Sequence, residues 1–212
     1  MAHARTAAAA GLALVAAVAV VGCSGGGSHA GSASTRSSVT AGGGGARANP
    51  APTESNPPGD IPDNQVYVPF RPASGFTGFT VKVPEGWART EKGTTAVFTD
   101  KLNTVRITTA AASATPTVGA VTNTVVRQLR TQVPKFAHPK VSEVKRHAGR
   151  IVLLTYQGDS VKDPVTGKVV RDAFERYAFF RQGHEVDLTL SGPVNADNVD
   201  PWRIVSDSFT WR

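Results

Sequence analysis

Beyond the first 22 residues, large hydrophobic side chains lie almost entirely after residue 60, and this limits which part of the chain can fold. Residues 24–65 consist mainly of Gly, Ser, Ala and Pro, as in SGGGSHAGSAS and AGGGGARANPAP, which cannot build a core. The single cysteine among 212 residues excludes an intramolecular disulfide and a cysteine-rich zinc site. We therefore expect a disordered tether over residues 23–65 and one globular domain over residues 66–212.

The first 22 residues have the features of a secretory signal peptide. Arg5 precedes an uncharged run of 17 residues, Thr6–Gly22, most of them small or aliphatic. A spanning helix needs about 20 strongly apolar residues, which disfavours a retained transmembrane anchor. Val20-Val21-Gly22-Cys23 resembles the lipobox of bacterial lipoproteins, and this resemblance implies cleavage before Cys23 and lipidation of its thiol. The alternative is an ordinary secretory peptide cleaved after Ala19, which leaves an unpaired thiol.

Hydrophobic periodicity predicts several strands and two helices in residues 66–212. The stretches FTVKV, TTAVFTD and TVRITTA are expected to form an antiparallel meander, and the continuously apolar run Ile151–Leu154 predicts a central strand covered on both faces. One helix is expected from a cap at Thr115 to a stop before Pro134, and another from Val199. Residues 162–169 are expected to form a hairpin tip. The result is an α+β domain with about five to seven antiparallel strands and helices on both faces.

Two motifs of the domain resemble the PsbP/Mog-like superfamily: FTVKVPEGW near its start and VDPWRIVSDSFTW at its end. With the lipobox and the low-complexity tether, they are similar to actinobacterial LpqN-type lipoproteins. The resemblance implies an α/β/α sandwich over residues 66–212 and a role in binding partners rather than in catalysis. For LpqN-type proteins it also implies a link to cell-envelope lipid biogenesis.

The positive charge of the domain is concentrated in one segment. Residues 60–212 carry 20 Lys/Arg and 15 Asp/Glu, too small an excess for a dedicated nucleic-acid binder. Over residues 127–150, however, Glu143 is the only acid among seven basic residues, including Lys140. We predict a docking patch for anionic lipid head groups or an acidic envelope polymer, formed by Arg127, Arg130, Lys135, Lys145, Arg146 and Arg150. The alternative is a solvated surface that keeps the domain soluble.

Catalytic and metal-binding patterns are weak in this sequence. It contains no Gly-x-Ser-x-Gly elbow and no His-Glu-x-x-His pair. Glu175, Glu185 and Asp187 lie on adjacent predicted strands and could serve glycosidic hydrolysis, although the solvated face of a sheet has the same composition. We therefore expect no enzymatic activity, no cofactor and no metal.

The resulting hypothesis is a lipid-anchored binding or accessory protein on the extracytoplasmic face of the cell membrane. Its expected partners are the membrane, through the anchor, and an envelope protein or lipid, but not nucleic acid. The alternative function is a carrier or sensor of a lipid or glycolipid envelope intermediate, and an envelope hydrolase is third.

Replacement of Cys23 by Ser tests the anchor. Because the acyl chains would supply the membrane affinity, at about 0.8 kcal/mol per buried methylene, we expect Cys23→Ser to release the domain or to leave it unprocessed. Membrane fractionation and the mass of the mature chain measure this. Unchanged membrane retention and unchanged mass would show that Cys23 is not lipidated.

Overall fold

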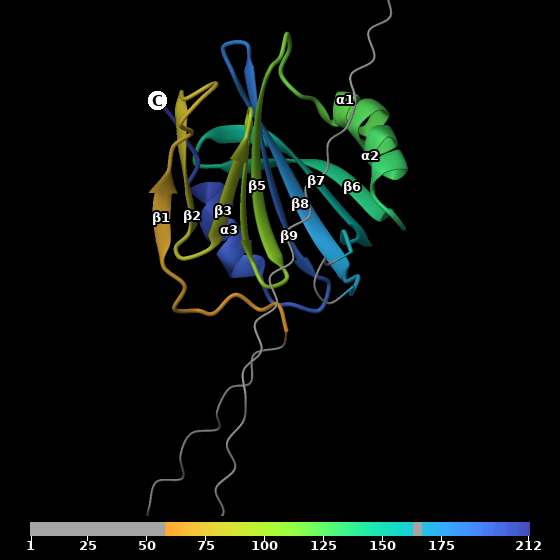
Figure 1. Ribbon diagram of the computed structural model, residues 1–212. Coiled ribbons are helices and arrows are strands. Elements are labelled where there is room, and N and C mark those ends of the chain that lie inside the picture. The colour runs from red at the N-terminus through yellow and green to blue at the C-terminus, as the bar shows by residue number, and fades with distance from the viewer. Residues whose placement is uncertain (1–57, 163–166) are drawn as a thin grey trace, which may run out of the picture. The chain divides into compact units, whose positions relative to one another are not determined.

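The computed structural model describes residues 58–162 and 167–212 (Figure 1). The predicted signal peptide, the lipidation site Cys23 and most of the predicted tether lie outside these residues. The described part contains a seven-stranded antiparallel sheet in the order β3-β4-β5-β9-β8-β7-β6 and a three-stranded antiparallel sheet in the order β1-β2-β10. The strands are β1 Tyr67–Phe70, β2 Phe79–Pro84, β3 Ala88–Lys92, β4 Thr95–Asp100, β5 Asn103–Ala111, β6 Ala137–Arg146, β7 Gly149–Asp159, β8 Arg171–Arg181, β9 His184–Pro193 and β10 Thr210–Trp211.

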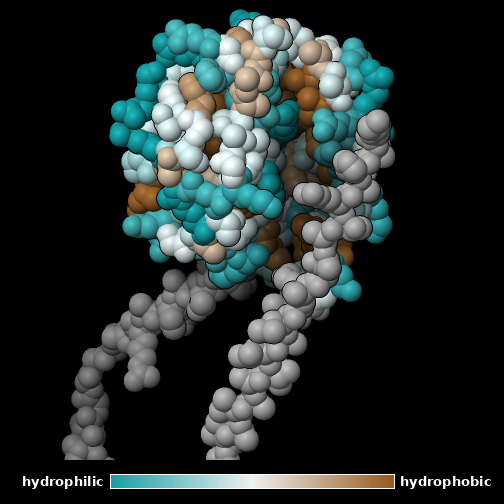
Figure 2. All heavy atoms as spheres, turned by 45° about the horizontal axis from the view of Figure 1, so that its top comes forward, coloured by the Kyte–Doolittle hydropathy of each residue, from teal (hydrophilic) through white to brown (hydrophobic). Residues whose placement is uncertain are grey.

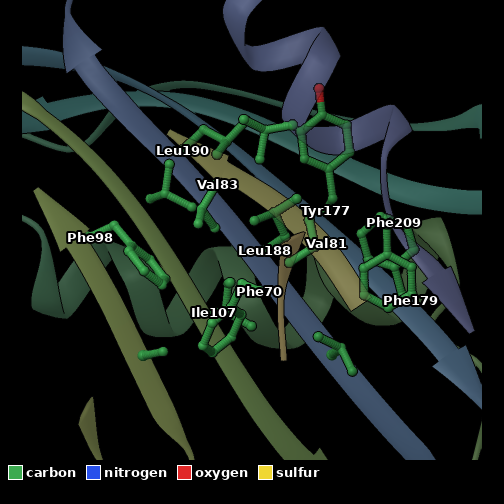
Figure 3. Packing of buried hydrophobic residues seen from close by; sticks show 14 of the residues in the cluster. Phe70, Val81, Val83, Phe98, Ile107, Tyr177, Phe179, Leu188, Leu190 and Phe209 are labelled. Atoms are coloured by element: carbon green, nitrogen blue, oxygen red, sulfur yellow. The ribbon is translucent and has the colours of Figure 1, made fainter. Parts of the chain in front are cut away.

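One face of the large sheet packs against the small sheet and the helix α3, Val199–Asp207. Phe209, which follows α3 and has no exposed surface, lies between Phe79 of β2 and Phe179 of β8. Its ring centroid is 5.2 Å from that of Phe79 and 3.8 Å from that of Phe179, with interplanar angles of 11° in both cases. Figure 3 shows the Phe209 and Phe179 rings face to face within this core. The aromatic stack therefore joins the two sheets.

The opposite face of the large sheet is covered by one helical segment. It consists of α1 (Val118–Ala120), a π-helical turn η1 (Val121–Val125) and α2 (Val126–Gln132), which follow one another without a break. Val121 and Val126 are buried there against Val152, Leu154 and Tyr156 of β7. In Figure 1 this helix and α3 lie on opposite sides of the sheet. The predicted fold class, an antiparallel sheet with helices on both faces, is confirmed.

The strand β7 is covered on both faces, as its continuous apolar run predicts. Ile151 and Leu153 point into the core beneath the small sheet, whereas Val152 and Leu154 point toward α2. The expected central position is wrong, because β7 lies next to the edge strand β6. A strand is covered on both faces wherever a helix packs on one face and the core packs on the other. β7 meets this condition although it lies next to the sheet edge.

Some other expectations need correction. The strand FTVKV is β2 of the small sheet, and the meander in the large sheet is completed instead by β3, whose residues are all exposed. The first helix is capped by Thr117, whose hydroxyl accepts the Ala120 N–H at 3.1 Å, rather than by Thr115. The second expected helix does begin at Val199. Val199 itself is 73% exposed, whereas Trp202 and Val205 face the core.

The fold begins before the expected boundary at residue 66. Ile61 is buried, and its N–H donates to Asn198 Oδ1 at 2.8 Å. The Asn198 amide in turn donates to the Gly59 carbonyl and to Asn103 Oδ1, both at 3.0 Å. These buried polar contacts make residues 59–61 part of the domain rather than of the tether.

Candidate functional site

A groove lies beside α2, where the helix leaves part of the large sheet uncovered. Its volume is about 600 Å³. The floor consists of side chains from β5, β9 and β8, and the wall of the C-terminal turn of α2 and the residues that follow it. On the face shown in Figure 2, hydrophobic residues form small, scattered patches in a mostly hydrophilic surface. The groove itself is lined by both apolar and polar side chains, as ligand sites commonly are.

Two arginines and one threonine form a row across the floor. Arg176 of β8 and Arg106 of β5 both lie opposite Thr189 of β9 in the strand register, on either side of it. The Arg176 guanidinium donates to Asp187 Oδ2 and lies 3.8 Å from Glu185 Oε1. Arg106 is exposed and forms no ion pair with any described residue. The Arg176 guanidinium of the floor is thus held by an ion pair, whereas the Arg106 guanidinium is accessible to a ligand.

Glu185 and Asp187 form a half-buried acidic pair beside Arg176. The pKa of Glu185 is raised to about 7, chiefly by burial and then by the neighbouring Asp187 carboxylate, whereas Arg176 lowers it. Burial also raises the pKa of Asp187, although Arg176 lowers it. Asp187 Oδ1 is buried without a hydrogen-bond partner. The pair therefore retains an unused acceptor in the groove.

A second buried acid lies at the other end of the groove, where β8 begins. Asp172 is 6% exposed, and its Oδ1 has no hydrogen-bond partner. The pKa of Asp172 is raised to about 6, chiefly by burial and in addition by the nearby Asp159 carboxylate. Asp159 itself is paired with Lys135 at 3.0 Å and with Arg171 at 3.4 Å. The hydrogen bond from Lys135 is the main reason why the pKa of Asp159 is lowered.

Apolar side chains complete the wall between the two acids. Tyr156 of β7 stacks on Phe174 of β8, with ring centroids 4.5 Å apart and an interplanar angle of 2°, and on Phe136 at 5.1 Å. A Cβ on Gly158 would lie only 2.2 Å from Val133 Cγ1, so a larger residue there would displace the end of α2. The groove therefore combines an aromatic wall with a floor of hydroxyls and charges.

The structure disperses the predicted basic patch. Lys135 pairs with Asp159, and Arg150 pairs with Glu143 at 3.2 Å. Arg146 points toward α3 on the opposite face of the sheet; its guanidinium donates to Ser206 Oγ at 3.0 Å and to the Tyr177 hydroxyl at 3.1 Å, and it lies 3.5 Å from Asp207. Of the six residues of the predicted patch, Arg127, Arg130 and Lys145 form no ion pair with any residue between 58 and 162 or between 167 and 212.

The predicted carboxylate candidates are also separated. Glu175 lies on the small-sheet face of β8, where it accepts a hydrogen bond from Tyr177, whereas Asp187 faces the groove. Sequence reasoning missed Arg106, Asp172 and Arg176 as site residues. The signal was present on β5 and β9, where polar residues alternate with buried apolar ones: Thr104, Arg106 and Thr108 on β5, and Glu185, Asp187, Thr189 and Ser191 on β9. On β8, Asp172 and Arg176 share their face with Phe174, so the pattern is weaker there.

The described residues contain no group of three or more His, Cys, Asp and Glu side chains that could hold a metal ion. Within the same residues, no helix has the length and apolar character needed to cross a membrane.

Comparisons with known proteins identify similar structures but no relatives in sequence. No protein-family model matches the chain, and no curated protein sequence matches it. Cyanobacterial PsbP from Synechocystis has a TM-score of 0.48 and 14% identity, over 73% of this chain and 98% of that chain. LpqN of Mycobacterium tuberculosis, involved in cell envelope biogenesis, has a TM-score of 0.41 and 15% identity, over 70% and 91%. The Saccharomyces cerevisiae Ran-binding protein Mog1p has a TM-score of 0.41 and 9% identity, over 62% and 79%.

These are the kinds of protein that the two sequence motifs resemble. All three TM-scores lie below 0.5, however, and all three identities below 25%. The likeness by itself therefore assigns neither a family nor a function to this chain.

The unpaired carboxylate of Asp172 predicts a dependence of stability on pH. Because its pKa is higher in the fold than the ordinary value of 3.8, the folded chain binds this proton more tightly than the unfolded chain, and stability falls as the pH rises from about 4 to above 6. We expect Asp172→Asn to be more stable than the unchanged chain by about 3 kcal/mol at pH 7.5 and nearly equally stable near pH 4, as measured by urea unfolding. Equal stability at both pH values would contradict this account of Asp172.

Proposed function

We propose that this chain is a lipid-anchored, extracytoplasmic binding protein that serves cell-envelope assembly, and that the groove beside α2 is its binding site. One observation supports the proposal most: the groove contains polar groups that no described residue uses. These groups are the Arg106 guanidinium and the buried oxygens Asp172 Oδ1 and Asp187 Oδ1. Buried polar atoms without partners are rare in folded proteins, so a ligand that supplies the missing partners is the natural explanation.

The same geometry supports binding rather than catalysis. Among the carboxylates considered for glycosidic hydrolysis, Glu175 lies on the other face of β8, and Asp187 is bonded to Arg176. A hydrolase of this kind needs two carboxyl groups on opposite sides of one substrate bond. The proposed protein therefore holds a ligand or a segment of a partner without transforming it.

A second candidate function is a carrier of a lipid or glycolipid intermediate of the envelope. The aromatic and aliphatic wall favours it, since Phe174, Leu129 and Val133 line the same groove as the hydroxyls of Thr104, Thr108 and Ser191. An apolar wall opposite a polar floor suits a ligand with both characters. The volume of about 600 Å³ accommodates a head group and only part of an acyl chain.

The proposal also includes a weak contact between the exposed basic side chains of α2 and anionic lipid head groups. Arg127 and Arg130 lie on the exposed side of the helix. The Arg130 guanidinium also lies 5.4 Å from the centre of the Phe136 ring. Each basic residue near an anionic surface contributes about 1 kcal/mol, so this contact supplements the acyl anchor rather than replacing it.

A bulky side chain in the groove tests the proposed binding site. Thr189 lies between Arg106 and Arg176, and a tryptophan there would fill the floor. We expect Thr189→Trp to lose any lipid or protein that co-purifies with the unchanged chain from membranes, as seen by native mass spectrometry. Thr90→Trp, on the exposed edge strand β3, is the matched control and should retain it. Retention by a folded Thr189→Trp variant would exclude the groove as the binding site.

Charge reversal tests the membrane contact separately. We expect Arg127→Glu with Arg130→Glu to reduce sedimentation with vesicles rich in anionic phospholipid by at least about tenfold in partition coefficient at low salt, because two positive charges become negative. The control is Lys82→Glu with Lys92→Glu, on strands β2 and β3, which changes the net charge by the same amount. This pair should have a smaller effect. Equal losses for the two pairs would mean that net charge alone is responsible.

A further inference from the structure

Asp172 differs from the other buried polar residues because nothing in its surroundings balances its charge. The residue is 6% exposed, lines the groove and leaves Oδ1 without a partner. Two basic residues of this region, Lys135 and Arg171, form ion pairs with Asp159 instead. Arg171 also donates a hydrogen bond to the Lys135 carbonyl at 2.6 Å. Asp159 is thus satisfied, while Asp172, which lies beside it, keeps an uncompensated negative charge.

The end of α2 adds to the negative potential at this point. Gln132 is the last residue of α2 and lines the groove together with Val133 and Pro134. The C-terminus of a helix carries a partial negative charge, equivalent to about half an elementary charge, because its last carbonyl groups have no partner within the helix. A buried carboxylate and a helix C-terminus at the same end of a groove both favour a positively charged group.

A metal ion does not fit this end of the groove. Calcium takes six to eight oxygen ligands, and magnesium needs about six in an octahedron. In residues 58–162 and 167–212, no group of three or more His, Cys, Asp and Glu side chains comes together. An ammonium group has only three donors, which one carboxylate oxygen and one or two carbonyl or hydroxyl oxygens can satisfy.

We propose that Asp172 and the C-terminal turn of α2 form a subsite for a primary ammonium group, so that the ligand of the groove carries a free amine at this end. The inference rests on the proposed function and makes it more specific. Along β8, Ala178, the register partner of Asp187, lies six positions after Asp172. At about 3.4 Å per residue this is about 20 Å, so the amine binds at one end of an elongated site and leaves Arg106 to contact the remainder of the ligand.

The subsite can be tested with a small amine and its neutral counterpart. We would titrate the full chain with n-butylammonium chloride and with n-butanol at constant ionic strength and pH 7.5, and follow the Asp172 carboxyl carbon and the amides of Gln132 and Val133 by NMR. The ammonium should cause a saturable shift of these signals, with an affinity at least about tenfold higher than that of n-butanol. Asp172→Asn should abolish the saturable shift. Asp187→Asn, which removes the other unpartnered carboxylate oxygen, should retain it.

Several outcomes would overturn the assignment. These are no saturable shift in the unchanged chain, equal affinities for n-butylammonium and n-butanol, equal binding by Asp172→Asn, or displacement of the ammonium by an equimolar amount of calcium chloride. Because Asp172→Asn is expected to be the more stable chain, loss of binding in this variant cannot come from unfolding. If Thr189→Trp loses the co-purifying material but the unchanged chain does not bind the ammonium, only the subsite fails. If the ammonium binds but Thr189→Trp retains that material, only the proposed function fails.

Discussion

The unequal covering of the two faces of the large sheet determines most of this structure. Strands lie about 4.8 Å apart, so seven of them span about 29 Å, whereas a helix with its side chains is about 10 Å wide. One face is covered by the three-stranded sheet together with α3, which is wide enough. The other face has only the helical segment 118–132, which packs on β7 and its neighbours. The strands that the helix does not cover must therefore carry polar side chains on this face. The groove lies where the covered part of the sheet meets the uncovered part.

The fully covered face supplies the stability that the open face lacks. Phe209 stacks between Phe79 and Phe179 without exposed surface, and truncation of such a residue typically costs about 3–5 kcal/mol. Arg146 strengthens the same side, because its guanidinium joins β6 to Ser206 of α3 and lies 5.1 Å from the centre of the Tyr177 ring. A rigid framework of this kind can tolerate buried carboxylates on the opposite face, where each unsatisfied group is unfavourable.

The sequence predicts individual elements better than it predicts their partners. Strands β5 to β9 and the core-facing residues Trp202 and Val205 of α3 follow from periodicity, because alternation depends only on which face is buried. Alternation does not say which sheet a strand joins, and β2 therefore could not be assigned to the small sheet. The basic residues counted in the sequence likewise predict a positively charged patch, but not the acidic residues that pair with them in the fold. Asp159, which pairs with Lys135, lies on β7, and Asp207, which lies beside Arg146, belongs to α3.

The acids of the groove show why its polar residues are better explained by a ligand than by the fold. Asp159 is a structural acid: two cations hold it, and its pKa is lowered. Asp172 lies on the neighbouring strand, has no such partner, and its pKa is raised. For structure alone, a neutral residue would serve better at this position, as Ser191 does at the next strand of the same floor. Because a carboxylate without a counter-charge destabilises the fold, its presence at this position supports the proposal that a positively charged group binds there.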